Sequence, residues 1–306
     1  MGRRRAGIVA LVAVLAGAGV AVVRARGCTW GTFAYEIFPE ERGVAPDIGV
    51  LRDGETLRVT HGNVSSTASL SPDGERIVFG RGRFSDEEGI RGLALFVSDL
   101  DGSDEELLTR RGGTPHWSPA GDEVLVLGGA IRVVDVETKK ERLVYRLPPP
   151  QGYDPDYIGT AAWSGDGARI AFFVGKTARE QSPGPVSYTE LWVVGADGSN
   201  PHRIARLEDE GLGDLAWSPD GETFAWTGIQ DLVLMDADEL EPWVAEPNAR
   251  RPQWSRDGDQ LAYVIGDEGR YDFRIVVGDA DGSNAVAVPG SPTGDQDLRL
   301  RDWASC

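Results

Sequence analysis

Histidine, cysteine and serine side chains are the residues of this chain with the potential for nucleophilic, acid–base or metal chemistry. The three histidines are His61, His116 and His202, and no Gly-x-Ser-x-Gly motif of a hydrolase nucleophile is present. His116 precedes Trp117 within a short strand-like run, which predicts a packed strand residue. No histidine or cysteine cluster has zinc spacing. The sequence therefore predicts neither a catalytic residue nor a metal site.

Acidic residues are abundant, and many of them stand in turns. Asp279-Ala280-Asp281-Gly282 brings glycine two positions too early for a calcium-binding loop, so we interpret it as a turn. The glycines occur in turns rather than before helices, which argues against a phosphate-binding loop. No cofactor is predicted. Carboxylates from distant strands can converge in a fold, so glycosidase- or lyase-type chemistry stays an alternative.

Binding chemistry is better represented, in two segments rich in tyrosine, proline and arginine. They are residues 148–157 (PPPQGYDPDY) and residues 176–188 (KTAREQSPGPVSY). Tyrosine, arginine and rigid proline are suited to protein contact surfaces. The predicted binding residues are Tyr153, Asp154, Asp156, Tyr157, Arg179 and Tyr188.

A repeated motif indicates the elements that position these segments. Trp-Ser followed by a tight turn begins at Trp117, Trp163, Trp217 and Trp254, and a fifth copy begins at Leu70. The motif serines are spaced by 47, 46, 54 and 37 residues. Ser-Pro-Asp-Gly has the residues of a type I turn ending in a left-handed glycine. Repetition at this spacing is typical of a repeat architecture.

Each motif is followed by short apolar runs that predict strands. Arg76-Ile77-Val78-Phe79 is a second strand, Leu191-Trp192-Val193-Val194 a third, and His202-Arg203-Ile204 a fourth. The runs are rich in β-branched and aromatic residues and too short for helices. Four-stranded units with a tryptophan signature describe propeller blades. The motif tryptophans are expected to pack between blades.

The connections of such blades alternate between two faces. The turns from strand one to two and from three to four share one face and are short. The other face carries long connections, at residues 80–92, 147–160, 175–189, 205–213 and 289–296. Variable loops on a rigid scaffold commonly carry function, so we expect the binding residues to act on this face.

The two ends of the chain are expected to share the sixth blade. Residues 298–306 form a first strand that stops at its turn, and residues 29–37, 47–51 and 55–60 supply the second, third and fourth strands. This closure removes an open sheet edge. The predicted fold is all-β: a six-bladed β-propeller of four-stranded antiparallel blades over residues 28–306, with N-terminal strands pairing with a C-terminal strand.

The only two cysteines, Cys28 and Cys306, stand at the two ends of the turn that the sixth blade lacks. We predict that they form a disulfide, which would persist outside the cytoplasm. Two free thiols are the first alternative. Lipid attachment at Cys28 is the second alternative, because Ala25-Arg26-Gly27-Cys28 has the small residue and the cysteine of a lipoprotein signal.

Residues 1–27 carry an export signal. Arginines at positions 3–5 precede 18 uncharged, mostly apolar residues, 6–23. The segment is a signal peptide or a retained N-terminal membrane anchor. Either one places the propeller outside the cytoplasm, secreted or held at the outer face of the cytoplasmic membrane. Membrane contact is expected only through this segment.

The charge balance argues against several partners. The chain has 31 basic and 49 acidic residues, a net charge of −18. Nucleic-acid binding needs clustered lysine and arginine, so it is not expected. The acidic surface favours a soluble monomer, and a small cationic ligand or basic partner is the alternative.

The repeat resembles that of the TolB-type β-propeller family. The shared pattern is Trp-Ser-Pro-Asp-Gly, then Ile-Ala-Phe, Leu-Trp-Val-Val and Asp-Gly-Ser-Asn, over roughly residues 48–306. Gly165 and Arg256 replace the turn proline, and Ala120 replaces the turn aspartate. The resemblance implies a non-catalytic binding or scaffolding module with a protein partner in the cell envelope. The alternatives are a hydrolase or lyase with carboxylates in the central channel, and an anchored sensor of a small cationic ligand.

Overall fold

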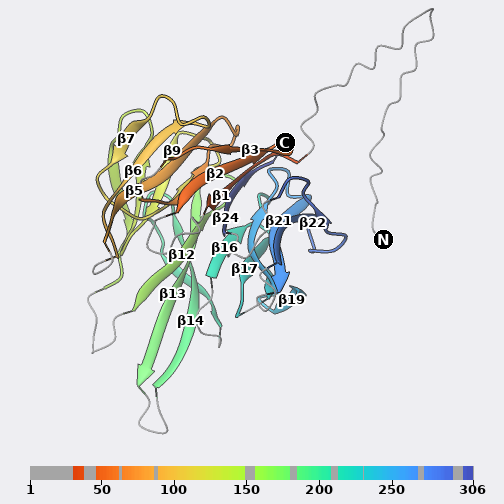
Figure 1. Cartoon of the computed structure of the whole chain (residues 1–306). Helices are drawn as coiled ribbons and strands as arrows, with labels where there is room; N and C mark the ends of the chain where they lie inside the picture. Colours follow the sequence, from red (N-terminus) through yellow and green to blue (C-terminus); the bar gives the residue numbers. More distant parts are fainter. Residues whose placement is uncertain are drawn as a thin grey trace, which may run out of the picture.

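The described part of the chain consists of β-strands. The computed structural model describes residues 30–37, 46–61, 64–85, 89–148, 156–179, 185–207, 213–229, 231–267, 272–291 and 299–305. These residues form six four-stranded antiparallel sheets, which confirms the predicted six-bladed propeller (Figure 1). Within these ranges, no helix has the length and apolarity to cross a membrane. The export segment, Cys28 and Cys306 lie outside the described residues.

The blades follow one another along the chain, apart from the one that joins both ends. The joining blade contains β24 (Arg299–Ala304), β1 (Thr32–Ile37), β2 (Asp47–Arg52) and β3 (Glu55–Arg58). The next contains β4 (Val64–Leu70), β5 (Arg76–Ser85), β6 (Gly89–Asp99) and β7 (Glu106–Thr109). It is followed by β8 (Thr114–Trp117), β9 (Glu123–Leu127), β10 (Ile131–Asp135) and β11 (Glu141–Tyr145).

The remaining three blades have the same order of strands. One contains β12 (Tyr157–Trp163), β13 (Arg169–Arg179), β14 (Pro185–Gly195) and β15 (His202–Leu207). The next contains β16 (Gly213–Trp217), β17 (Thr223–Thr227), β18 (Leu232–Asp236) and β19 (Pro242–Glu246). The last contains β20 (Ala249–Trp254), β21 (Gln260–Asp267), β22 (Asp272–Asp279) and β23 (Val286–Ala287).

Ring closure occurs as the sequence predicts. β24 pairs antiparallel with β1, with Phe33 opposite Trp303 and Thr32 opposite Ala304. The rings of Phe33 and Trp303 stack with centroids 5.6 Å apart. The first strands meet around the axis, because β24 contacts β4, β4 contacts β8, β12 contacts β16, β16 contacts β20, and β20 contacts β24. The C-terminal strand therefore contributes to the inner wall beside strands from the rest of the chain.

The repeated turn is held by its serine. In the first copy the Ser71 hydroxyl donates to Asp73 at 2.5 Å and accepts from the backbone N–H of Arg76 at 2.9 Å. Gly74 N–H donates to the Ser71 carbonyl at 2.8 Å, with the glycine at φ +68°. A left-handed conformation at this position favours glycine, which explains its place in every copy. The same serine–aspartate bond occurs at Ser164, Ser218 and Ser255.

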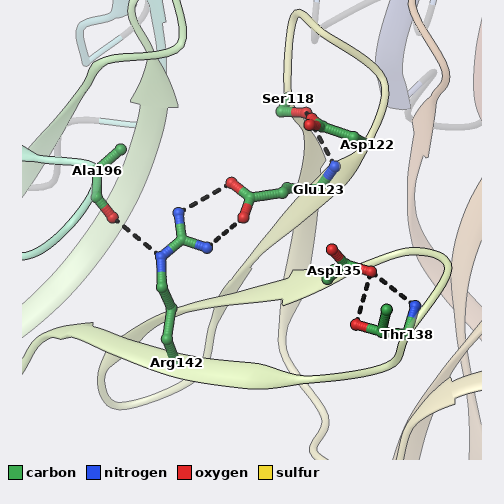
Figure 2. Close-up of polar contacts among 7 residues, drawn as sticks. All are labelled: Ser118, Asp122, Glu123, Asp135, Thr138, Arg142 and Ala196. Carbon is green, nitrogen blue, oxygen red and sulfur yellow. Dashed lines mark hydrogen bonds and ion pairs between the residues drawn. The ribbon is translucent and has the colours of Figure 1, made fainter.

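One copy of the turn lacks the aspartate and forms the serine hydrogen bond with a different acid. Ala120 occupies the turn position of the acid, and the Ser118 hydroxyl donates instead to Asp122 at 3.1 Å (Figure 2). The Ser118 hydroxyl still accepts from the N–H of Glu123 at 3.1 Å. The turn therefore tolerates the departure from the motif because a later acid takes over the hydrogen bond.

The motif tryptophans pack between neighbouring blades, as predicted. Trp117 from β8 lies in a buried cluster with Val78 and Leu95 from the preceding blade. Trp217 from β16 lies in a cluster with Phe173 and Leu191 of the blade before it. Burial of an aromatic side chain removes a large apolar area from water, so these contacts join blades that share no hydrogen-bonded strand.

Two segments expected as long connections are hairpins instead. β5 and β6 pair as far as Ser85 and Gly89, and β13 and β14 pair as far as Arg179 and Pro185. Figure 1 shows the ribbon of β13 and β14 running away from the rest of the molecule. The sequence of these hairpins does not alternate between apolar and polar residues as a half-buried strand does. The reason is that the paired ends extend beyond the other two strands of the blade, where no face is buried.

Candidate functional site

The predicted binding residues that the structure describes lie at one end of the blade β12–β15. Asp156 immediately precedes β12, Tyr157 begins it, and Tyr188 lies in β14. Arg179 is the last residue of β13, and only its backbone is described. Tyr153 and Asp154 lie outside the described residues. β12 is roughly 20 Å long, so these residues lie at the opposite end of the blade from the short turn that follows β12.

Tyr157 and Tyr188 present different surfaces. The Tyr157 side chain is 56% exposed. Its ring lies over Gly175, where a Cβ atom would stand 2.3 Å from the ring, so a larger residue there would displace the tyrosine ring. Tyr188 is partly buried, and the guanidinium carbon of Arg206 lies 3.8 Å from its ring centroid. This distance gives a cation–π contact.

A network of charges lies at the same end of the blade. Lys176 Nζ donates to Asp156 Oδ2 at 2.5 Å and lies 4.0 Å from Glu190 Oε2. Arg203 Nη1 donates to Glu190 Oε1 at 2.7 Å, and Trp192 Nε1 donates to Glu190 Oε2 at 2.9 Å. The Glu190 side chain is only 5% exposed. Asp156, Tyr188 and Glu190 therefore lie with Lys176 on one face of the sheet, whereas Tyr157 pairs with Gly175 and its ring lies on the opposite face. Glu190 and Arg203 were not selected by the sequence interpretation.

A second candidate site is a cavity of about 330 Å³ at the opposite, short-turn end of the channel. Each first strand contributes the residue before the motif tryptophan or its equivalent: Ser69, His116, Ala162, Ala216, Gln253 and Asp302. The rim consists of the second residue after that tryptophan: Pro72, Pro119, Gly165, Pro219, Arg256 and Ser305. All six blades therefore form its wall.

Asp302 is the one carboxylate among the described residues that line this cavity. Its Oδ2 accepts from Ser69 Oγ at 2.6 Å and from Leu70 N–H at 2.9 Å, and its Oδ1 accepts from Trp303 N–H at 2.7 Å. Burial raises the pKa of this carboxyl, while these hydrogen bonds oppose the shift. Oδ2 joins the C-terminal strand to β4, and Oδ1 bonds within β24 itself, so both oxygens have a structural role.

His116 lies on the wall beside the motif tryptophan of its blade. Its Nε2 atom is buried and has no hydrogen-bond partner within the described residues. Burial lowers the pKa of His116 to about 4, with Asp214 opposing the shift and Arg301 adding to it. The imidazole is therefore neutral at pH 7, in agreement with its prediction as a packed strand residue.

The motif tryptophans line the cavity as well as packing between blades. Trp163 Nε1 donates to the His116 carbonyl at 3.1 Å, and Trp303 Nε1 donates to the Trp30 carbonyl at 2.7 Å. The indole nitrogens of Trp117, Trp217 and Trp254 are buried without an acceptor in the described part of the chain. Buried donors without acceptors are costly, so these three groups require an explanation.

The described wall of the cavity holds one hydroxyl–carboxylate pair. The Ser69 hydroxyl donates to Asp302 Oδ2 at 2.6 Å and accepts from the backbone N–H of Trp117 at 2.9 Å. A lyase- or glycosidase-type site needs converging carboxylates, and Asp302 is alone in the described wall. Among the residues with described positions, no three His, Cys, Asp or Glu side chains gather as a metal site would require.

Comparisons with known proteins place the fold. No protein-family model and no curated protein matches the chain. Among solved structures, TolB from Acinetobacter baumannii is similar with a TM-score of 0.65 and 16% identity, over 90% of this chain and 66% of that one. A TolB-type protein from Agrobacterium tumefaciens has a TM-score of 0.55 and 17% identity, over 85% of this chain and 88% of that one.

An enzyme is also among the similar structures. Oligogalacturonate lyase from Vibrio parahaemolyticus has a TM-score of 0.54 and 15% identity, over 84% of this chain and 72% of that one. The chain is therefore a six-bladed β-propeller structurally similar to TolB and related propellers, at low sequence identity. Likeness at this level describes the fold, and the fold hosts both non-enzymes and enzymes.

Proposed function

We propose that this chain is a non-catalytic, extracytoplasmic binding or scaffolding module of the cell envelope. Its protein partner docks on the long-connection surface, defined as Asp156, Tyr157, Lys176, Tyr188 and Arg206. The observation that carries this proposal is the exposed Tyr157 at the same end of the blade as a cation–π pair and a charged network, which occupy the opposite face of the sheet. Aromatic and arginine side chains are enriched in protein interfaces, and charged pairs at the rim guide orientation.

The ribbon of β13 and β14 supports a role in docking. It leaves the blade beside the long-connection surface and projects from the molecule (Figure 1). Beyond Gly175, β13 has no partner on its β12 side within the described pairing, because the β12–β13 ladder begins at Tyr157 and Gly175. An approaching protein can therefore contact both the surface and the ribbon.

The proposal that the module is non-catalytic rests on the cavity wall. The hydrolase or lyase alternative places several carboxylates in the channel, whereas the described wall holds Asp302 alone. That carboxylate already accepts three hydrogen bonds. The alternative of a sensor for a small cationic ligand is weakened by the same observation, because one fully hydrogen-bonded acid is a poor cation site.

The test is the capture of partners by cross-linking in the native cell envelope. The wild-type chain is compared with a variant in which Tyr153, Tyr157, Arg179 and Tyr188 are all changed to Ala. We expect a specific protein adduct with the wild type and its loss in the variant. A matched control is Trp243→Ala, which removes an aromatic residue that is 40% exposed in β19 of another blade.

The control variant should retain the adduct, and the circular dichroism of all three proteins should agree. An adduct that persists in the quadruple variant would contradict the placement of the surface. Turnover of an oligosaccharide or ester substrate by the purified chain would contradict the non-catalytic role.

A further inference from the structure

The turn that precedes β19 has the backbone of the turn that precedes β11 but different side chains. Lys139 and Leu240 hold the same place in the two turns, each with a φ of +58° and each donating its N–H at 3.0 Å to the carbonyl of the aspartate four residues earlier. Lys-Lys-Glu-Arg at residues 139–142 is replaced by Leu-Glu-Pro-Trp at residues 240–243. The β19 turn therefore lacks all three basic residues of its counterpart and gains two apolar ones.

Trp243 occupies a position that carries a charge in two other blades. It lies in the register position that Arg142 holds in β11 and Glu106 holds in β7. Those two charges each form an ion pair with the first residue of the second strand of their blade. In the blade of Trp243 that residue is Thr223, so an ion pair of this kind cannot form. The Trp243 side chain is instead 40% exposed to solvent.

β19 leaves apolar side chains exposed on both faces of its blade. Trp243 and Val244 are consecutive, so their side chains project from opposite faces, and Val244 is 56% exposed. β19 is also the outer strand of its sheet, and β18 is its partner in the described pairing. Pro242 has no N–H to donate, so the open main-chain edge extends from Trp243 to Glu246. Such an edge is suited to a second extended segment.

The charge around this strand has a single sign. Residues 231–248 contain six acidic residues and no basic one. Asp238, Glu239 and Glu241 are exposed, and none of them takes part in the ion pairs of the described residues. By contrast, the outer strands β3, β7, β11 and β15 each have a residue in an ion pair. A segment beside β19 therefore gains most if basic residues flank its apolar ones.

A second copy of this strand would not provide those basic residues. When β19 pairs antiparallel with its own copy so that Trp243 lies opposite Val244, Glu241 lies opposite Glu246. Like charges directly opposite one another destabilise a strand pair. The charge pattern therefore favours a different chain as the occupant of this edge.

We propose that this edge binds an extended, basic segment of a partner protein. The outer-strand patch is defined as Leu240, Glu241, Trp243, Val244 and Glu246. Apolar side chains of the segment contact Trp243 and Val244, and flanking lysine or arginine side chains pair with the two glutamates. A cation can also lie on the Trp243 ring. The patch is on the outer rim of a different blade from the long-connection surface and does not depend on the function proposed for that surface.

The experiment measures the fluorescence anisotropy of labelled peptides that are titrated with the whole chain. The first probe is Lys-Thr-Val-Val-Thr-Lys with an amidated end, whose length matches residues 241–246. Antiparallel to β19, it places its lysines opposite the glutamates and its valines opposite Trp243 and Val244. The comparison probes are Glu-Thr-Val-Val-Thr-Glu and Lys-Thr-Gly-Gly-Thr-Lys. We expect saturable, salt-sensitive binding of the first probe, none of the acidic one, and affinity about tenfold weaker for the glycine one.

Paired variants separate the patch from general effects of charge and apolar surface. Glu241→Lys and Trp243→Ala should each weaken binding of the first probe by about tenfold. The turn before β11 already has Lys140 in the equivalent place, so the Glu241 variant should fold. The matched controls in that other blade are Glu137→Lys and Leu143→Ala, the second of which removes a side chain that is 52% exposed. Both controls should leave the affinity unchanged.

Three results with the peptides would overturn the proposal. They are equal affinities for the acidic and the basic probe, equal losses in the patch variants and their controls, and no binding of the first probe at millimolar concentration. Sedimentation velocity of the chain without peptide adds a fourth. Self-association that Trp243→Ala abolishes would make a second copy the occupant, whereas a sedimentation coefficient independent of protein concentration supports a different partner.

Discussion

The two ends of the blade β12–β15 satisfy their polar groups in different ways. At the long-connection end the described charges meet within the blade, as Lys176 with Asp156 and Arg203 with Glu190. An aromatic side chain, Tyr157, remains exposed. At the short-turn end the blade contributes to a cavity lined by the motif tryptophans, and some indole N–H groups, among them that of Trp217 of the next blade, are buried without an acceptor in the described residues. The first end therefore satisfies its charges by pairing, whereas the second leaves buried donors unpaired.

The largest contrast between the ends should appear in stability. Trp217 is buried, and its ring lies 4.9 Å from that of Phe224. Trp217→Ala should lower the free energy of unfolding by about 3–5 kcal/mol through the cavity it leaves between blades. Tyr157→Ala should change it by about 0.5 kcal/mol or less. Urea denaturation measures both, and similar losses would contradict the division between a structural and a surface aromatic residue.

Acid should act on the short-turn end through His116. Its pKa is about 4 in the folded protein, compared with 6.5 when unfolded, so the unfolded chain binds more protons between these values. Stability therefore falls as the pH decreases from 6.5 towards 4, by up to roughly 3 kcal/mol. His116→Gln should flatten this part of the profile.

Urea denaturation from pH 7.5 to 4.5 provides the measurement for His116. Asp214 and Arg301 influence the same imidazole, so Asp214→Asn serves as the comparison. Loss of the Asp214 charge should steepen the pH dependence slightly, because it removes the group that favours the imidazolium. Parallel profiles for the wild type and His116→Gln would show that His116 is not the acid-sensitive group.

At the long-connection end, Glu190 should be the most important charge. Glu190→Ala leaves the Trp192 N–H without its acceptor and removes the partner of Arg203. Because the Arg203 side chain is 54% exposed, water compensates in part, and we expect a loss of about 1–2 kcal/mol. Asp156→Ala should cost less, because the Asp156 side chain is 32% exposed and that of Glu190 only 5%. The opposite order in thermal unfolding would contradict the network as described.

The smallest predicted effect on stability concerns an ion pair that two neighbouring blades share with opposite polarity. Arg142 forms a bidentate pair with Glu123, at 2.8 Å through Nη2, and also reaches the Ala196 carbonyl of the next blade (Figure 2). Arg76 and Glu106 hold the equivalent places in the preceding blade with the charges exchanged. A double-mutant cycle on Glu123 and Arg142 should give a coupling of about 0.5–1 kcal/mol.

Exchange of the charges makes that prediction sharper. Glu123→Arg combined with Arg142→Glu should recover most of the coupling, because the neighbouring blade already uses this polarity at the same positions. A double variant less stable than either single variant would show that the contact from Arg142 to the Ala196 carbonyl, rather than the ion pair, stabilises the blade interface.

Local sequence signals predict the fold well. The Ser-Pro-Asp-Gly turns, the short apolar runs and the strand at residues 299–304 predict six blades and their closure, and the structure confirms each. The turns and strands depend on residues close together in sequence, and closure follows from the incomplete blade at each end of the repeat. The hairpins β5–β6 and β13–β14 were expected as loops, because strands that extend beyond a blade have no buried face to impose alternation.

The candidate sites depend on distances that the sequence does not contain. The composition of residues 148–157 and 176–188 points to the long-connection surface, where the described residues Asp156 and Tyr188 lie on one face of the sheet and Tyr157 on the other. The cavity combines residues from each of six repeats, so its wall appears only once the blades are assembled. The substitution of Asp122 for the turn acid at Ala120 is likewise evident only from the hydrogen bond.

Photo-cross-linking from two single positions tests the division between the ends most directly. p-Benzoylphenylalanine is placed at Tyr157 in one variant and at Arg256 in another, and both are irradiated in the native cell envelope. We expect a discrete protein adduct from position 157. From position 256 we expect no protein adduct in comparable yield. A protein adduct formed from position 256 and absent from position 157 would contradict this division, because the partner would then dock on the short-turn end.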